Sequence, residues 1–303
     1  MPMSFAHVDL VVQARNGVGE SPVWLPQEQA LYWVDIPARK MLRWMGRDAQ
    51  LSSWTLPETI GCIASAQDGT WLCAMETGVA SVRLGESGNL TQFEMRTSIA
   101  HPLEKMRFND GRCDRQGRMR AGTMYTDMAA AKPVGAVYAL NDGRIPEVLV
   151  DGLLTPNGMA FSPDGRTMYL SDSHSVSQQI WAFDYDPERG IPTNRRLFVD
   201  MNHHPGRPDG AAVDEDGCYW TCANDAGQIH RFTPAGRLDR SIALPVKKPA
   251  MCAFGGPQMD TLFVTSIRTP EMAAAATHLD GGLFALRPGV KGLAETLASV
   301  EIP

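Results

Sequence analysis

The stretch TPNGMAFSPDGRTMYLSDS, residues 155–173, contains the clearest local structural signal in the sequence. Within it, SPDG (162–165) has Pro at the second position and Gly at the fourth, which is typical of a type I turn. The short apolar segments NGMAF and TMYLSD flank this turn, so the stretch predicts a β-hairpin. The first strand nevertheless begins with a polar residue, Asn157, directly after a proline.

The hairpin is one of several similar units. Segments like TMYLSD occur six times, and their first residues are 39, 48, 49, 51 and 43 positions apart. They are LYWVDI from Leu31, TWLCAM from Thr70, RMRAGT from Arg118, TMYLSD from Thr167, CYWTCA from Cys218 and TLFVTS from Thr261. A further predicted strand follows in each unit: MLRWM (41–45), VASVRL (79–84), AVYAL (136–140), IWAFDY (180–185), QIHRFT (228–233) and GLFALR (282–287).

Six such units predict an all-β fold, a six-bladed β-propeller with four-stranded antiparallel blades, as a single domain over residues 1–303. Blades that pack face to face explain why the strands are largely apolar. The N-terminal segment 6–14 is expected to complete the sheet of the last unit and close the ring. Two β-sandwiches, the competing fold, do not explain a period of about 50 residues. The best helical candidate, PEMAAAATHL (270–279), falls in a loop between strands.

Composition narrows the class of protein. The chain has 303 residues, 44% of them hydrophobic and 20% charged, and a formal net charge of −6 with scattered basic residues. We therefore expect a globular protein without nucleic acid as a partner, either a monomer or a weak homo-oligomer. No apolar run suits a membrane helix, and the N-terminus does not resemble a signal peptide.

The six cysteines lie mostly in apolar segments, which predicts buried thiols in a reducing cytoplasm. Cys218 and Cys222 are spaced as a zinc pair could be, but no second Cys/His pair with ligand spacing follows.

Alignment of the strand before each turn explains why this apolar strand begins with the polar residue Asn157. The equivalent positions are Glu20, Ile60, Asn109, Asn157, Asp209 and Ala250. We call these six positions the ring positions. In a propeller these positions meet at one end of the central axis. Two carboxylates and two carboxamides that converge there would repel one another and lack hydrogen-bond partners unless a positive group offsets them. One divalent cation is the simplest compensation, and oxygen ligands favour Ca²⁺, Mg²⁺ or Mn²⁺, although Zn²⁺ also accepts them. We predict that Glu20, Asn157 and Asp209 bind it.

Five segments carry a resemblance to a known family. They are GVGESPVW (17–24), KMRFNDGRCDRQGRMRAGTM (105–124), PNGMAFSPDGRTMYLSDS (156–173), RPDGAAVDEDGCYWTC (207–222) and AFGGPQMDTLFVTS (253–266). In these segments and their order the sequence resembles the SMP-30/gluconolactonase/regucalcin-like family. The resemblance implies a six-bladed propeller that hydrolyses sugar lactones in carbohydrate catabolism with one divalent metal.

The resemblance also implies roles for single residues. Glu20, Asn157 and Asp209 match the metal ligands of the family, in agreement with the alignment of the repeats. Arg107 and Asn109 match residues that bind the ring oxygens and hydroxyls of the substrate. The family often has a Glu in the loop after AGTM, for which Asp127 is the nearest equivalent. Its shorter side chain suggests a changed substrate preference.

These residues suggest a mechanism and leave alternatives open. A cation can polarise the lactone carbonyl and acidify water, and Asp209 is expected to accept the water's proton. The first alternative is a non-catalytic calcium-binding propeller. The second is a related metal-dependent esterase or phosphotriesterase that uses the same site. The residues identify neither the sugar nor the metal.

Overall fold

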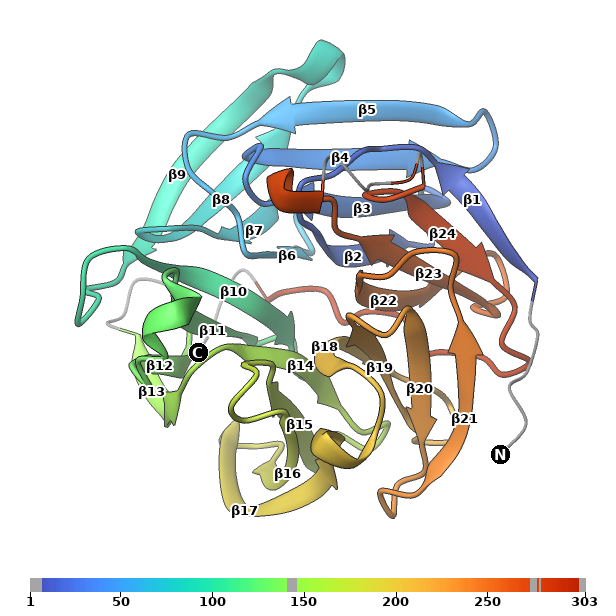
Figure 1. Ribbon diagram of the computed structural model, residues 1–303. Helices are drawn as coiled ribbons and strands as arrows, with labels where there is room; N and C mark the ends of the chain where they lie inside the picture. Colours follow the sequence, from blue (N-terminus) through green and yellow to red (C-terminus); the bar gives the residue numbers. More distant parts are fainter. Residues whose placement is uncertain (1–6, 141–145, 273–276, 278, 300–303) are drawn as a thin grey trace.

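The structure is a computed structural model and describes residues 7–140, 146–272, 277 and 279–299. Its strands form six four-stranded antiparallel sheets that surround one axis as blades (Figure 1). This confirms the predicted six-bladed β-propeller. Each of the predicted second strands begins within one residue of its predicted position.

The first three blades follow one another in the chain, each running from the axis to the periphery. Blade 1 consists of β2 (Gly19–Leu25), β3 (Ala30–Asp35), β4 (Lys40–Met45) and β5 (Gln50–Thr55). Blade 2 consists of β6 (Cys62–Ser65), β7 (Trp71–Ala74), β8 (Gly78–Leu84) and β9 (Leu90–Ser98). Blade 3 consists of β10 (Met106–Cys113), β11 (Met119–Tyr125), β12 (Gly135–Ala139) and β13 (Glu147–Leu153).

The remaining blades complete the ring. Blade 4 consists of β14 (Pro156–Phe161), β15 (Thr167–Asp172), β16 (Gln179–Asp186) and β17 (Ile191–Asp200). Blade 5 consists of β18 (Arg207–Val213), β19 (Tyr219–Asn224), β20 (Gln228–Phe232) and β21 (Leu238–Ala243). Blade 6 consists of β22 (Pro249–Gly255), β23 (Thr261–Ser266), β24 (Leu283–Leu286) and the N-terminal strand β1 (Val8–Val12).

Strand β1 closes the ring as predicted. It pairs antiparallel with β24, with Val8 opposite Leu286 and Leu10 opposite Phe284 (Figure 1). The outer strand of the last blade therefore comes from the other end of the chain. This arrangement ties the first and last blades together through backbone hydrogen bonds.

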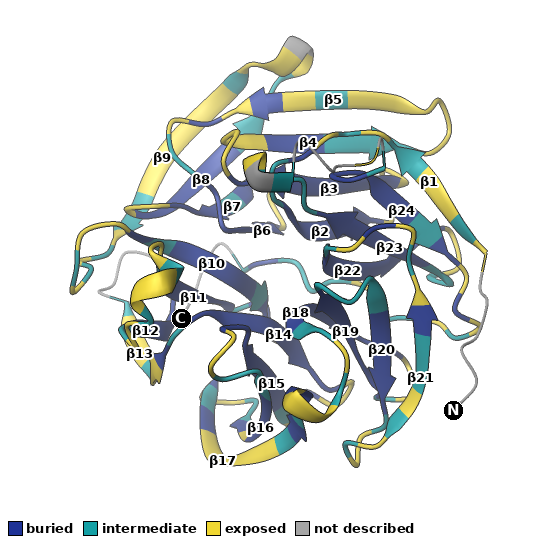
Figure 2. Ribbon diagram, viewed as in Figure 1, coloured by how far each residue is buried: buried dark blue, intermediate teal, exposed yellow. Residues whose placement is uncertain are grey.

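Burial decreases from the axis outward. Every residue of β2, β14 and β22 is buried, whereas β9 is mostly exposed (Figure 2). Both faces of the inner strands pack against neighbouring blades, which explains their continuous apolar runs. The six cysteines, as predicted, are all buried free thiols.

The turns after the inner strands share one glycine position. In four blades this glycine has a positive φ and donates a backbone hydrogen bond to the residue three positions earlier, as a tight turn requires. The glycines are Gly69, Gly117, Gly165 and Gly217, with φ values of 77°, 84°, 68° and 78° and hydrogen bonds of 3.1, 3.1, 2.9 and 3.0 Å. The repeated sequence signal thus has a conformational cause.

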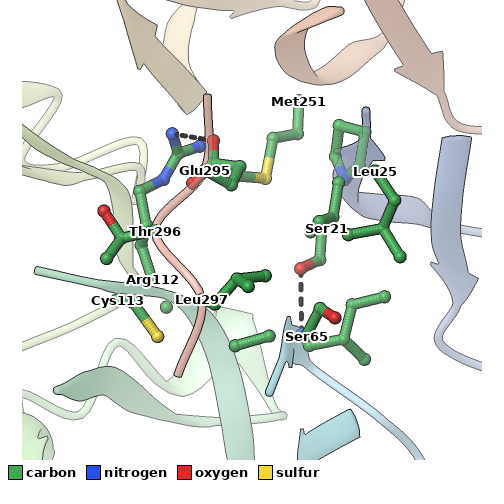
Figure 3. Close-up of a pocket in the computed structure, with 14 residues that line it drawn as sticks. Ser21, Leu25, Ser65, Arg112, Cys113, Met251, Glu295, Thr296 and Leu297 are labelled. Atoms are coloured by element: carbon green, nitrogen blue, oxygen red, sulfur yellow. Dashed lines mark hydrogen bonds and ion pairs between the residues drawn. The ribbon is translucent and has the colours of Figure 1, made fainter. Parts of the chain in front are cut away.

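The C-terminal segment 291–299 crosses the far end of the axis, at these turns. The Glu215 amide bonds to the Lys291 carbonyl at 2.9 Å, and the amide of Ala298 bonds to the Ser65 carbonyl at 2.7 Å. Glu295 forms an ion pair of 2.7 Å with Arg112 of β10 (Figure 3). The segment thereby joins blades 2, 3 and 5. A cavity of about 20 Å³ remains beneath it, room for about one water molecule.

Within the described ranges, helical structure is limited to single turns. The described residues contain four 3₁₀ helices: η1 (Glu86–Gly88), η2 (Met128–Ala130), η3 (Met201–His203) and η4 (Pro270–Met272). Of the helical candidate 270–279, only η4 is observed, and residues 273–276 and 278 lie outside the described residues. None of the helices in the described ranges has the length and apolar character to cross a membrane.

Two glycine substitutions test the packing of the C-terminal segment. A Cβ at Gly117 would lie 2.7 Å from both the Leu297 carbonyl and Ser299 Oγ, whereas at Gly217 the nearest atom lies at 3.5 Å. Because both glycines have positive φ, Gly217→Ala isolates the backbone strain. We expect Gly117→Ala to lower the free energy of unfolding by about 1–3 kcal/mol more than Gly217→Ala in urea titrations. Equal losses would contradict the packing described.

Candidate active site

Backbone irregularities mark the ring positions. In five of the six inner strands the pairing register with the second strand shifts at or beside the ring residue. Such β-bulges bend a strand and redirect its side chains. In β2 and β14 the residue that follows the ring position, Ser21 or Gly158, has a φ of 51° or 57°. The sequence repeats therefore position these side chains through a shared distortion of the inner strands.

The structure brings Asn157 and Asp209 into direct contact. Asn157 Nδ2 donates a hydrogen bond of 2.5 Å to Asp209 Oδ1, and Asn224 Nδ2 donates one of 2.6 Å to Oδ2. All three side chains are buried. Burial raises the pKa of Asp209 to about 6, although the two carboxamides oppose this shift.

Glu20 belongs to the same electrostatic cluster. It is buried, and burial raises the pKa of its carboxyl well above the usual value. The negative charges of Asp209 and Asp110 raise this pKa further, while the positive charge of Arg107 opposes them. Residues from blades 1, 3 and 5 therefore interact across the axis.

Arg107 and Asn109 form a connected pair on β10. Arg107 Nη1 donates hydrogen bonds to Asn109 Oδ1 at 2.9 Å and to the Phe108 carbonyl at 2.8 Å. Asn109 Nδ2 donates to the Pro156 carbonyl at 3.0 Å, which links blade 3 to blade 4 beside Asn157. Desolvation lowers the pKa of Arg107. The pair thus places one partly buried cation next to the acidic cluster.

Asp127 is placed differently from the ring residues. It is exposed and precedes η2, and no side-chain hydrogen bond caps the helix. Helix η2 contacts blade 4 through Met128. Thr155 Oγ1 lies 3.4 Å from Met128 Sδ, and His174 Nε2 lies 2.8 Å from the Met128 carbonyl. The loop is thereby held near the ring, but a substrate contact of Asp127 stays a prediction.

Two neighbours of the ring were missed by sequence reasoning. Asn224 fixes the second oxygen of Asp209, but it lies on β19, a second strand, whereas the repeat alignment covers first strands only. Asp110 directly follows Asn109, and nothing in the repeat pattern assigns it a role. Its Oδ2 accepts a hydrogen bond of 2.8 Å from the Met159 amide, while Oδ1 has no partner among the described residues. Burial raises its pKa to about 6.

The donor set suits a hard cation. Glu20 and Asp209 are buried carboxylates whose mutual repulsion raises the pKa of Glu20, and Asn157 adds a carboxamide. A divalent ion offsets such charge and prefers oxygen ligands. Among the described residues no group of three or more His, Cys, Asp or Glu side chains could hold a metal, so the amide of Asn157 is needed to complete a set of three.

The fold and the site define this protein as a six-bladed β-propeller with buried oxygen-bearing side chains at one end of its axis. The model of the SMP-30/gluconolactonase/LRE-like region matches residues 18–268, and the chain belongs to this family. It is 36% identical over 294 residues to 6-deoxy-6-sulfogluconolactonase of Pseudomonas putida, covering 95% of this chain and 97% of the relative. It is 33% identical over 267 residues to regucalcin of Danio rerio, covering 87% and 88%.

A comparison with solved structures supports the same fold. The calcium-binding protein regucalcin of Agrobacterium tumefaciens superposes with a TM-score of 0.89 and 25% identity, covering 98% of this chain and 99% of that one. The family and the fold implied by the resemblance are therefore confirmed. The individual site residues stay predictions.

The raised pKa values predict a pH dependence of stability. Because folding raises the pKa of Asp209 from 3.8 to about 6, the folded state binds this proton more tightly than the unfolded chain. In EDTA, wild-type protein should therefore lose stability relative to Asp209→Asn as the pH rises from about 4 to 7, by up to about 3 kcal/mol. Urea titrations of both proteins across this range measure the difference. A difference that stays constant, or that shifts in favour of the wild type as the pH rises, would contradict the assignment.

Proposed function

We propose that this protein hydrolyses a sugar lactone to the sugar acid, using one divalent metal held by Glu20, Asn157 and Asp209. The observation that carries the proposal is the buried contact of Asp209 with Asn157, next to the carboxylate of Glu20. Membership of a family whose relatives include a named lactonase supports the reaction class.

The residues of the site have separate roles in this reaction. When bound, a divalent cation supplies Lewis-acid chemistry, which polarises an ester carbonyl and acidifies water. Asp209 accepts the proton of the attacking water as general base. The hydrogen bond from Asn224 to Oδ2 holds the Asp209 carboxylate in one orientation. This positioning lowers the reorganisation that proton transfer requires.

Arg107, Asn109 and Asp127 are proposed to bind the substrate. Arg107 is half-buried and has further N–H donors beyond those used for Asn109 and Phe108. It can donate charge-assisted hydrogen bonds to the oxygens of the sugar or to the carboxylate of the product. Asn109 keeps Arg107 in place, and the exposed Asp127 is available to sugar hydroxyls.

The metal and the setting are also part of the proposal. The oxygen donors fit Ca²⁺, Mn²⁺ or Mg²⁺, and Zn²⁺ is the remaining candidate. The Agrobacterium neighbour is described as a calcium-binding protein, which supports Ca²⁺. The six buried free thiols support the cytoplasm as the compartment. The substrate is expected to be the main partner, with no nucleic acid or membrane involved.

A panel of lactones tests the function. Acid release from glucono-, galactono-, xylono- and arabinonolactone should be accelerated by the protein, abolished by EDTA and restored by a divalent metal. A lactone with a sulfonate at C6 belongs in the panel because of the name of the Pseudomonas relative. Absence of metal-dependent hydrolysis on every lactone would reject the proposal and favour the non-catalytic calcium-binding alternative.

Two conservative substitutions test the ligand set. Glu20→Gln and Asp209→Asn keep the size of the side chains but remove one negative charge each. We expect each to weaken metal binding by at least about 100-fold in calorimetric titrations, since even outer-sphere partners of a metal contribute about 10- to 100-fold. Hydrolysis should fall in parallel.

Asp184→Asn is the matched control, because Asp184 is exposed and pairs with Arg196 on the outer part of blade 4. It removes the same charge and should leave metal binding as in the wild type. Retained metal affinity in both Glu20→Gln and Asp209→Asn would show that the metal is bound elsewhere.

A further inference from the structure

A pair of cations shares one carboxylate next to the ring. Arg207, the first residue of β18, donates from Nε to Asp225 Oδ2 at 2.8 Å. Lys248 donates from Nζ to the other oxygen of the same carboxylate. We call Arg207, Asp225 and Lys248 the cationic cluster. Its two positive charges and one negative charge leave it with a net charge of +1.

The cationic cluster lies beside the proposed metal ligands. Arg207 precedes Asp209 by two residues and is paired with Asn224, whose side chain donates to Asp209. Lys248 directly precedes β22, the inner strand of blade 6.

Blade 6 places no side-chain oxygen at its ring position. That residue, Ala250, is buried and has no oxygen in its side chain. The oxygen-bearing ring residues therefore come from blades 1, 3, 4 and 5, and the charged groups that the blade 5 and blade 6 side offers next to them are those of the cationic cluster.

The cluster keeps unused capacity for hydrogen bonds. Besides Asp225, Arg207 bonds only to the Ser173 carbonyl, through Nη1 at 3.0 Å, so its Nη2 has no hydrogen-bond partner among the described residues. The side chains of Arg207 and Lys248 are 24% and 22% exposed, so solvent or a ligand can reach them. Guanidinium and ammonium groups in such a setting bind oxyanions well.

The charge of the cluster favours an anionic substrate group. Fixed cations attract an anionic substituent, whereas a neutral sugar can be bound through its hydroxyls by uncharged donors. The two cations sit on separate blades, so a terminal group with several oxygens can bridge them.

We propose that the substrate is a sugar lactone that carries a terminal oxyanion group, a sulfonate, phosphate or carboxylate, and that Arg207 and Lys248 bind this group. The inference rests on the proposed lactonase function and defines the class of substrate for that site.

The ratio of two kcat/KM values tests it. For the wild-type protein, kcat/KM should be at least about 10-fold higher for a lactone with a C6 sulfonate, a C6 phosphate or a C6 carboxylate than for neutral glucono-1,5-lactone. The three anionic lactones, measured side by side, distinguish the source of the oxyanion. The preference should weaken as NaCl is raised, since the cluster is partly exposed.

Substitutions in the cluster should move this ratio in opposite directions. Arg207→Met and Lys248→Met should each lower the anionic-to-neutral ratio by about 10- to 100-fold, mainly through KM. Asp225→Asn removes the competing carboxylate and should raise the ratio. Asn also tolerates the φ of 74° at this position. Arg196→Gln, which removes an arginine from an exposed ion pair on blade 4, should leave the ratio as in the wild type.

The outcomes separate the two proposals. Hydrolysis of neutral lactones with a ratio of one or less would overturn the inference and leave the lactonase proposal standing. A ratio that falls in Asp225→Asn as much as in Arg207→Met would indicate a structural ion pair and also overturn it. If Arg207→Met fails to fold, the anionic-to-neutral ratio of Asp225→Asn tests the inference: a higher ratio than in the wild type supports it, and a lower ratio overturns it. No hydrolysis of any lactone, with equal calorimetric affinities for gluconate and 6-sulfogluconate, would reject both.

Discussion

The site depends on negative charge that is buried at one end of the propeller axis. Glu20, Asp110 and Asp209 come from three blades and are all shielded from solvent. Their raised pKa values show that the fold itself disfavours ionisation at this point. Carboxamides from Asn157 and Asn224 reduce the imbalance without removing it. A divalent cation would offset this charge, and this fit connects the architecture to the proposed chemistry.

The scaffold holds these groups in place from two ends. At the ring, bulges in the inner strands set the direction of the side chains. At the far end, glycine turns and the C-terminal segment fix the ends of the same strands. Arg112 bonds to Glu295 (Figure 3) and also to the Ala211 carbonyl. Because the inner strands are short, small shifts at one end would change the geometry at the other. The cationic cluster adds a second charged element beside the ring.

Features that depend on local sequence patterns could be predicted from the chain, whereas contacts between blades could not. Turn residues and apolar strands recur once in each blade, so the six sheets and the closing strand β1 could be predicted from the chain. The repeat alignment also selected Asn157 and Asp209, which are in contact, while their role as metal ligands stays a prediction. The partners of the ring residues could not be predicted. Asn224 and Asp110 reach their contacts through strand register and twist between blades, which no linear pattern encodes. The path of the C-terminal segment follows no repeat, and the cationic cluster joins residues from separate blades.

A crystal structure with Mn²⁺, phased by anomalous scattering, would locate the metal. We expect one strong anomalous peak on the propeller axis, with oxygens of Glu20, Asn157 and Asp209 at about 2.0–2.6 Å from the ion. A peak held by other residues, or an axis without a peak while Asn157 still donates to Asp209, would contradict it.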